Sequence, residues 1–371
     1  MKTVFILGAG ASAEAGAPLM GDFIARAKKL HAVDGFGQER AQIQDVLDAA
    51  YKDLKPVQVK SSIAYHNIEE LFSAIDMGAM LNVFGSRDPS TLQALQTAVR
   101  VFIYRTIEET VRLTRVGQRI ESPKGYATLA ELTLEKIKRT ARYGHKDVSF
   151  ITFNYDTCLE FALVRAGLGV DYGLDEPFVC EHEARYQAGR QVAIPVLKLH
   201  GSINWAQCLQ CNVVAPTEID FWRPVSFMDV LDQPKSLPLP VGTHIAKLQH
   251  RCGSKLDPVP VIVPPTWNKA ANGDGLQSVW KRAAQELGSA DNIVVIGYSM
   301  PVTDTFFKYL FALGSDSDVH LEKFVVINGT EGGQSEQRFK DLLGPMSAKA
   351  FRYHSFVFSG ARKVIEEVLA A

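Results

Sequence analysis

The fold of this chain is decided by its N-terminal stretch, Thr3-Val4-Phe5-Ile6-Leu7-Gly8-Ala9-Gly10-Ala11-Ser12. The apolar run predicts a buried strand over Thr3–Leu7, and the glycines after it open an alanine-rich helical stretch. Glycines at such a place let the backbone approach a pyrophosphate, and the N-terminus of a helix favours its negative charge. The alternative is a plain turn between a strand and a helix. The segments that follow the other predicted strands distinguish a phosphate-binding loop from such a turn.

Short apolar segments return after residue 146. Helices are expected between the later ones, over Leu276–Leu287 and Thr303–Leu313. Short apolar strands that alternate with helices favour an α/β fold with a doubly wound parallel sheet. The further strands that the sequence predicts are Val148–Phe153, Ile194–Leu199, Val259–Val263, Ile293–Ile296 and Phe324–Ile327.

The region between the first strand and residue 146 has helical periodicity. Asn67 is a favourable N-cap for one helix, and two longer helices are predicted over Leu92–Leu113 and Ala127–Ala141. The expected organisation is an α/β domain of residues 1–22 and 146–371, a large helical insertion of residues 23–145, and a small cysteine-containing module of residues 206–256 within the α/β domain.

Small and polar residues follow the predicted strands. Ligands of an open parallel sheet bind beyond the carboxyl ends of the strands, so these residues would gather at one edge. The sequence predicts a crevice there, floored by glycines and flanked by Asn154, Asp156 and His200. The segments that would meet are Gly8-Ala9-Gly10-Ala11-Ser12, Asn154-Tyr155-Asp156, His200-Gly201-Ser202-Ile203-Asn204-Trp205, Gly297-Tyr298-Ser299 and Asn328-Gly329-Thr330.

Two common enzyme classes fit this pattern poorly. A nicotinamide dehydrogenase should show a second strand that ends in an acidic residue about twenty residues after the glycines. Asp34 stands near that distance, but residues 28–33 do not have the pattern of a strand. The nucleophile elbow of a serine hydrolase needs glycine two residues after the serine, and Glu14 stands there after Ser12.

The composition is that of an ordinary globular protein. The chain has 371 residues, of which 46% are hydrophobic and 22% charged, and its formal net charge is −1. This balance excludes a disordered chain and does not favour direct nucleic-acid binding. No apolar run approaches the ~20 residues that a membrane helix needs. Five cysteines without a signal peptide lead us to expect a reduced, cytoplasmic protein with no membrane partner.

Taken together, these segments resemble the motifs of the sirtuin family. They occur in the family's order from residue 8 to about residue 330, and residues 24–145 lie outside the resemblance. The nucleotide loop of sirtuins resembles Gly8-Ala9-Gly10-Ala11-Ser12 with Gly16-Ala17-Pro18 and Asp22-Phe23. Their Thr-Gln-Asn-Ile-Asp segment resembles Thr152-Phe153-Asn154-Tyr155-Asp156, and their catalytic His-Gly-Ser segment resembles His200-Gly201-Ser202. Their late ribose loops resemble Gly297-Tyr298-Ser299 with Asn328.

The resemblance implies a sirtuin-like sheet of the Rossmann type that takes NAD as its substrate. It also implies which residues would touch NAD. These are Gly8, Ala9, Gly10, Ser12, Asp22, Phe23, Gly201, Ser202, Gly297, Ser299 and Asn328.

Two departures separate this chain from the sirtuin deacylases. Those enzymes carry Ile-Pro-Asp-Phe-Arg after the glycine loop, whereas Leu19-Met20-Gly21 separates Pro18 from Asp22 here. Where their Val-Trp-Phe-Gly-Glu segment pairs with the acylated peptide, this chain has Val261–Lys269, in which two consecutive prolines remove backbone donors. The variant resembles the sirtuin-like NAD hydrolases of bacterial defence systems, whose activity depletes NAD in infected cells.

Cleavage of the bond between nicotinamide and ribose requires few catalytic groups from a protein. Nicotinamide leaves as a neutral molecule, and the ribose passes through an oxocarbenium-like centre. We expect Asn154 to hold the ribose hydroxyls or the attacking water, His200 to act as general base, and Asp156 to orient polar groups or stabilise positive charge. The alternatives are that Asn154 and Asp156 cap helices and that His200 is a buried core histidine.

The cysteines of the small module suggest a metal site. Cys208-x-x-Cys211 matches the first half of a zinc ribbon, whereas the second half retains Cys252 but lacks the expected cysteine before it. His250 or His244 would supply the fourth ligand, because imidazole binds zinc well. A structural zinc site of Cys208, Cys211, Cys252 and His250 is expected, and a degenerate ribbon without metal stays open.

The sequence thus leads us to expect an NAD hydrolase that releases nicotinamide and ADP-ribose, as an effector of defence against phage. An NAD-dependent protein deacylase and a non-catalytic sensor of NAD or ADP-ribose stay open as alternatives. A toxic hydrolase needs restraint, so a homo-oligomer is expected, or a partner such as a P-loop ATPase of the helicase type. The expected assembly surface is the helical face formed by Leu92, Leu95, Val99 and Phe102.

Overall fold

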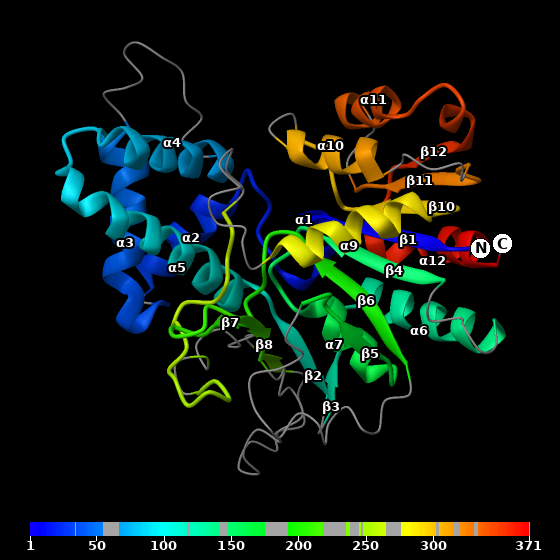
Figure 1. The fold of residues 1–371 in the computed structure, drawn as a ribbon, viewed down its shortest axis with the longest axis horizontal. Helices are drawn as coiled ribbons and strands as arrows, with labels where there is room; N and C mark the ends of the chain where they lie inside the picture. The colour runs from blue at the N-terminus through cyan, green and yellow to red at the C-terminus, as the bar shows by residue number, and fades with distance from the viewer. Residues whose placement is uncertain are drawn as a thin grey trace.

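A seven-stranded sheet forms the centre of the computed structural model (Figure 1). Its strands follow the order β12-β11-β10-β1-β4-β6-β5, and every neighbouring pair is parallel. This confirms the parallel α/β sheet predicted from the sequence. The structure describes residues 1–33, 35–54, 67–116, 119–140, 147–174, 192–217, 235–237, 245, 248–264, 276–301, 304–314, 320–329 and 333–370.

The central strands coincide closely with the predicted apolar segments. They are buried on both faces, which is why their sequences are continuous apolar runs rather than alternating ones. The strands of the sheet are β1 (Thr3–Leu7), β4 (Val148–Thr152), β5 (Gly169–Asp171), β6 (Ala193–Lys198), β10 (Asn292–Ile296), β11 (Lys323–Ile327) and β12 (Phe351–His354).

The strand predicted over Val259–Val263 is wrong. Within the described residues, this segment makes a single antiparallel bridge, between Ile262 and Gly201, and joins no sheet. Pro260 has no N–H to give to a ladder. The N–H groups on either side of Ile262 instead donate to the carbonyls of Trp205 and His200. The segment therefore packs along the loop that follows β6.

β1 lies in the middle of the sheet although it comes first in the chain. The chain adds β4 and β6 on one side of β1, and later adds β10, β11 and β12 on the other side. The order of the strands thus reverses between β1 and β10, and this reversal is where open α/β sheets bind their ligands.

Helices flank the sheet. α6 (Lys124–Arg139) packs against α7 (Cys158–Arg165) and α12 (Arg362–Leu369), and α9 (Gln277–Gly288) packs against α10 (Thr305–Gly314). In Figure 1, α9 crosses in front of the sheet and α12 lies behind it. α11 (Gly333–Leu342) places Phe339 against Phe324 of β11.

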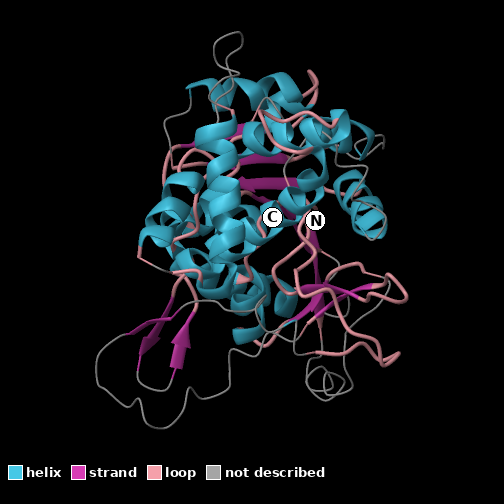
Figure 2. Cartoon of the chain, turned by 90° about the vertical axis from the view of Figure 1, so that its left-hand side faces the viewer, coloured by secondary structure: helices cyan, strands magenta, loops and turns pink. Residues whose placement is uncertain are grey.

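Four helices between β1 and α6 form a group of their own, which faces the viewer in Figure 2. The group consists of α2 (Phe23–Ala32), α3 (Arg40–Asp48), α4 (Ile68–Leu81) and α5 (Leu92–Thr110). Asn67 caps α4 as predicted, because its side chain accepts a hydrogen bond of 2.9 Å from the N–H of Glu69. The short strands β2 (Leu113–Val116), β3 (Arg119–Glu121) and β9 (Lys235–Leu237) form an antiparallel sheet.

The predicted assembly surface on α5 is wrong. Leu92, Leu95, Val99 and Phe102 are exposed by 3% at most. α5 is the central helix of its group and packs against α2, α3 and α4, so its apolar face forms the core of that group. None of the described helices combines the length and the apolar character that crossing a membrane requires.

Candidate functional site at the carboxyl edge of the sheet

The glycine loop after β1 packs tightly against the end of β10. The N–H of Gly8 donates to the carbonyl of Ile296, and the N–H of Gly10 donates to the carbonyl of Gly297. A Cβ atom on Gly10 would lie 2.8 Å from the Cα of Gly297. The glycines therefore permit close contact between two strand ends. The N–H groups of Gly8 and Gly10, which the sequence pattern would offer to a phosphate, therefore already donate hydrogen bonds within the protein. The helix that follows, α1 (Ala9–Ser12), is only four residues long.

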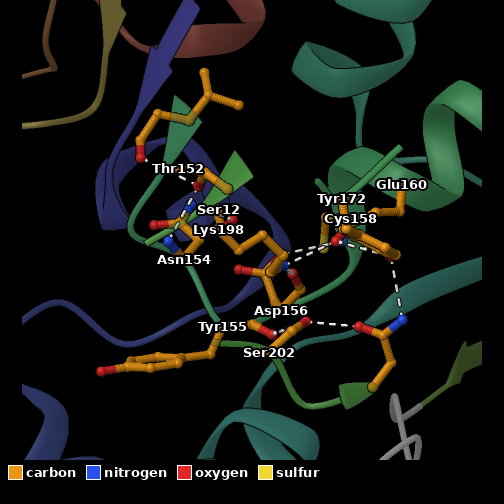
Figure 3. A network of polar contacts seen from close by, with 12 residues as sticks. Ser12, Thr152, Asn154, Tyr155, Asp156, Cys158, Glu160, Tyr172, Lys198 and Ser202 are labelled. Carbon is orange, nitrogen blue, oxygen red and sulfur yellow. Dashed lines mark hydrogen bonds and ion pairs between the residues drawn. The ribbon is translucent and has the colours of Figure 1, made fainter. Parts of the chain in front are cut away.

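Asn154 follows β4 with its side-chain amide held by the glycine loop (Figure 3). Its Nδ2 donates to the carbonyl oxygen of Gly8 at 2.9 Å and to Oγ of Ser12 at 3.1 Å, and lies 3.3 Å from Oη of Tyr126. Among the described residues, no N–H or O–H group donates a hydrogen bond to Oδ1 of Asn154. The amide is therefore fixed in orientation, and it leaves an acceptor rather than a donor for a ligand.

Tyr126 is a residue of this site that the sequence did not reveal. It comes from the first turn of α6, is 1% exposed, and lies 2.7 Å from Oγ of Ser12. Burial raises the pKa of its hydroxyl, and the negative charge of Asp156 raises it further. Tyr126 therefore stays neutral and holds Ser12 beneath Asn154. Tyr126 directly precedes the helix predicted over Ala127–Ala141, and that position gave no sign of this contact.

His200 follows β6, the strand beside β4, and is 3% exposed. Its ring centroid lies 5.4 Å from that of Phe153, the residue before Asn154, and 6.1 Å from that of Tyr155. Phe153 in turn stacks on Tyr298, which follows β10, at 4.4 Å. Aromatic contacts thus connect the ends of β4, β6 and β10 at one edge of the sheet.

The carboxylate of Asp156 is used at the start of α7. Its Oδ1 accepts a hydrogen bond of 3.0 Å from the N–H of Cys158, the first residue of that helix. This contact matches the capping alternative raised from the sequence. The thiol of Cys158 is fully buried, and burial raises its pKa, so this cysteine is not an activated nucleophile.

Gly201 and Ser202 shape the loop after His200. Gly201 has φ +81°, and a Cβ atom there would lie 2.1 Å from the carbonyl oxygen of Val261, so only glycine fits. The hydroxyl of Ser202 is buried and lies 2.6 Å from Oδ1 of Asn204 and 3.2 Å from the carbonyl oxygen of Tyr155. Gly201 and Ser202 therefore make contacts within the protein.

Asp22 and Phe23 also make contacts within the protein. Asp22 precedes α2, where its carboxylate accepts hydrogen bonds from the N–H of Leu19 and from Nε of Arg26, each at 2.7 Å. Phe23 is 5% exposed and stacks on Phe102 of α5 at 6.0 Å. Phe23 therefore belongs to the core of the α2–α5 group.

The late loops bring a buried donor to the same edge. Ser299 is exposed, and its carbonyl accepts hydrogen bonds from Oγ of Ser335 and from Nη2 of Arg338. Asn328 follows β11 and is 8% exposed, and among the described residues no acceptor meets its Nδ2. A buried donor without an acceptor costs free energy, so an acceptor atom of a ligand would be favoured there.

The four predicted metal ligands lie together beside β7 (Trp205–Gln207) and β8 (Val214–Pro216). The sulfur of Cys252 lies 3.6 Å from that of Cys208 and 3.7 Å from that of Cys211, and Nδ1 of His250 lies 3.0 and 3.3 Å from the sulfurs of Cys252 and Cys211. Zinc–sulfur bonds of about 2.3 Å place tetrahedral ligands about 3.8 Å apart. The cluster therefore fits a closed structural zinc site.

Two thiols of this cluster shift their pKa in opposite directions, because the hydrogen bond with Cys208 raises the pKa of the Cys211 thiol to about 11. Burial acts to raise the pKa of the Cys208 thiol, but the N–H groups of Cys211 and Gln210 lower it to about 6. The thiolate is the form of cysteine that binds metal ions. None of the described cysteines forms a disulfide bond. His244, the other candidate for the fourth ligand, lies outside the described residues.

Purified protein is expected to contain one zinc ion per chain, measured by inductively coupled plasma mass spectrometry. Cys252→Ser is expected to lose the metal and to lower the melting temperature by several degrees, because the closed site would lose a ligand. Cys158→Ala is the matched control and should retain the metal, since Cys158 lies outside the cluster. Full zinc content in Cys252→Ser would contradict the four-ligand site.

Comparisons with known proteins concern the fold. Neither a family model nor a curated protein matches this chain. Solved structures similar to it include a Sir2 homologue in complex with NAD, with 17% identity and a TM-score of 0.43, over all of this chain and 89% of that one. Another is Sir2 with the inhibitor EX-527, 2′-O-acetyl-ADP-ribose and a deacetylated p53 peptide, with 16% identity and a TM-score of 0.41, over all of this chain and 95% of that one. Because these TM-scores lie below 0.5, function has to be argued from the residues at the sheet edge.

Proposed function

We propose that this protein binds NAD at the carboxyl edge of its sheet and hydrolyses the bond between nicotinamide and ribose. The observation that carries the proposal is the placement of Asn154 and His200. They follow two adjacent strands, β4 and β6, and the side-chain amide of Asn154 donates to the glycine loop of β1. An acceptor amide and an imidazole at a shared edge are the groups that this reaction needs.

The described residues suit a dinucleotide at this place in two further ways. The strand order reverses beside β1, and dinucleotides bind at such reversals in open α/β sheets. The unsatisfied Nδ2 of Asn328 offers a donor for a ribose hydroxyl at the end of β11. Since the amides of Gly8 and Gly10 are used within the protein, the pyrophosphate would rely on the other groups that surround the loop.

The reaction consumes water and releases nicotinamide, ADP-ribose and a proton. The bond from the ribose C1′ to the pyridinium nitrogen breaks, and its electron pair leaves with neutral nicotinamide. Oδ1 of Asn154 accepts a hydrogen bond from the attacking water or from a ribose hydroxyl. The water oxygen binds C1′, and His200 takes its proton. Asp156 acts indirectly, because its carboxylate holds the start of α7.

One observation favours hydrolysis over deacylation of a peptide. The N–H groups of Val261 and Val263 donate to the carbonyls of Trp205 and His200, and the carbonyl of Val261 accepts from the N–H of Ser202. The carbonyl of Val263 accepts from Oη of Tyr155 at 2.8 Å. These backbone groups are therefore unavailable to an added peptide strand. The second of the two consecutive prolines, Pro265, lies outside the described residues.

The proposed biological role is depletion of NAD during defence against phage, in the cytoplasm. The resemblance of the motifs to bacterial defence hydrolases supports this role. Residues 23–145 are proposed as a helical insertion beside a catalytic α/β domain, which itself contains a small module over residues 206–256. A second copy of the chain or a P-loop ATPase is proposed as the restraining partner.

The proposal is tested by measuring nicotinamide release from NAD by purified protein, without any peptide. We expect nicotinamide and ADP-ribose in equal amounts, and loss of both products in Asn154→Ala, because the acceptor that orients the water is gone. Release that requires an acetylated peptide would identify a deacylase instead. Binding of NAD by calorimetry without release in either condition would leave two readings, a sensor or an enzyme that is gated by a partner.

A further inference from the structure

Lys198 and Glu160 form an ion pair that is buried near the carboxyl edge of the sheet. Nζ of Lys198 lies 2.8 Å from Oε1 of Glu160, and each side chain is only 1% exposed. Lys198 is the last residue of β6, and Glu160 lies in the first turn of α7. No step of the proposed hydrolysis uses either residue, so the pair needs another explanation.

The ammonium group of Lys198 connects the two loops that carry the proposed site. It stands two residues before His200 in the chain. The same Nζ also donates to the main-chain oxygen of Asp156, which stands two residues after Asn154. One buried cation therefore contacts the loop after β4 from the strand that leads to His200.

Further contacts extend this link from Glu160 through Tyr172 to Ser202 (Figure 3). Oη of Tyr172 lies 3.5 Å from Oε1 of Glu160 and accepts a hydrogen bond of 3.1 Å from Nδ2 of Asn204. The hydroxyl of Ser202 shares its one hydrogen between two acceptors, Oδ1 of Asn204 at 2.6 Å and the carbonyl oxygen of Tyr155 at 3.2 Å. We call the residues Lys198, Glu160, Tyr172, Asn204 and Ser202 the Lys198 ring.

The Lys198 ring begins and ends at two consecutive carbonyls, those of Tyr155 and Asp156. These carbonyls directly follow Asn154. The N–H of Ile203 also donates to the carbonyl of Tyr155, at 3.0 Å. Both peptide groups after Asn154 are therefore held by side chains or amides that belong to the His200 strand and its loop.

Stability alone does not account for the ion pair. Replacing a buried ion pair by apolar residues of similar volume is often neutral or stabilising. Burial raises the pKa of Glu160 although the charge of Lys198 acts to lower it. With a folded-state pKa above the unfolded value, this group favours folding below its ordinary pKa, and that contribution is lost as the pH rises through the folded-state value. Among the described residues, no donor meets Oε2 of Glu160.

We infer that the Lys198 ring is a positioning device that fixes the loop of Asn154 relative to the loop of His200. The inference rests on the proposed function, since it assigns the ring to that site. A displacement of about 1 Å between reacting groups can cost about 10²-fold in rate without weakening ground-state binding. The ring would thus act on kcat rather than on the affinity for NAD.

The double variant Lys198→Met/Glu160→Met tests this inference, because it removes both charges at nearly constant volume. We expect it to fold, with kcat for NAD hydrolysis about 10²-fold lower and KM within about threefold of the wild type. Hydrogen–deuterium exchange followed by mass spectrometry should show faster exchange in peptides that cover residues 153–157 and 200–204, since the amide of Ile203 depends on this arrangement.

The matched control is Arg105→Met/Glu108→Met in α5. That pair is also buried, with side chains 9% and 0% exposed and Nη1 of Arg105 at 2.7 Å from Oε2 of Glu108. We expect it to leave kcat, and exchange in the two loops, as in the wild type. A fall in kcat of equal size in both double variants would overturn the inference, because any buried pair would then have the same effect.

Other outcomes separate the inference from the proposed function. A folded Lys198→Met/Glu160→Met protein with unchanged kcat and unchanged loop exchange overturns the positioning role. A wild-type protein that releases no nicotinamide overturns the proposed function, while loop exchange still decides whether the ring orders the two loops. Should the double variant fail to fold, Tyr172→Phe opens the ring without touching a charge. Faster exchange over residues 200–204 supports the inference, and unchanged exchange overturns it.

Discussion

His200→Ala is expected to lower kcat for NAD hydrolysis by about 10²–10⁴-fold, because the water would lose its general base. The KM for NAD should change little, since the imidazole ring packs against the aromatic rings of Phe153 and Tyr155 and is proposed to act on the water. Removing the ring leaves a space of its own size among these aromatics. Added imidazole is therefore expected to restore part of the rate, measured as nicotinamide release.

The control for this prediction is His320→Ala. His320 is exposed and precedes β11, so it lies at the opposite end of that strand from Asn328. This variant should hydrolyse NAD at the wild-type rate. Full activity of His200→Ala would exclude a role as general base and would leave His200 as the buried core histidine that the sequence also allows.

Gly297→Ala is expected to lower the free energy of unfolding by about 3 kcal/mol or more. Gly297 has φ +63°, and a Cβ atom there would lie 2.1 Å from the N of Ala11 and 2.4 Å from the carbonyl carbon of Gly10. Both neighbours are backbone atoms, so no side-chain rotation relieves the overlap. The loops after β1 and β10 would have to separate, and binding of ADP-ribose should be lost with them.

Thermal unfolding and titration calorimetry with ADP-ribose measure these two effects. Gly21→Ala is the matched control, because a Cβ atom at Gly21 meets nothing within 4 Å. It should melt and bind as the wild type does. If Gly297→Ala were as stable as Gly21→Ala, the close approach of the two loops would not be needed for the fold.

The sequence predicts the centre of the sheet well because burial on both faces leaves a continuous apolar run. β5 and β12 carry no such signal, since β5 is three residues long and Phe351–His354 is a half-exposed edge strand. Val259–Val263 has the apolar composition of a strand, but it pairs with no strand in the part of the chain that the structure describes. Composition alone does not distinguish a buried strand from a buried loop.

The residues of the candidate site likewise divide into those that the sequence predicts and those that it does not. Asn154 and His200 are predictable because they directly follow recognisable strands. The metal ligands are predictable because Cys208-x-x-Cys211 has a spacing set by local geometry, and the structure brings Cys252 and His250 to it. Tyr126 and Lys198 were not predictable, because their contacts with Asn154 and Asp156 span 28 and 42 residues of chain.

The central place of β1 has a consequence for how the protein is made. The N–H of Lys2, directly before β1, donates to the carboxylate of Asp291, 289 residues further along the chain. At about 5–20 residues per second, a ribosome leaves β1 without this neighbour for roughly 15–60 s. Gly297 and Asn328 emerge later still, so the sheet edge is incomplete throughout that time. On the proposed function, the NAD site cannot be complete before Asn328 has left the ribosome, and the producing cell would keep its NAD until then.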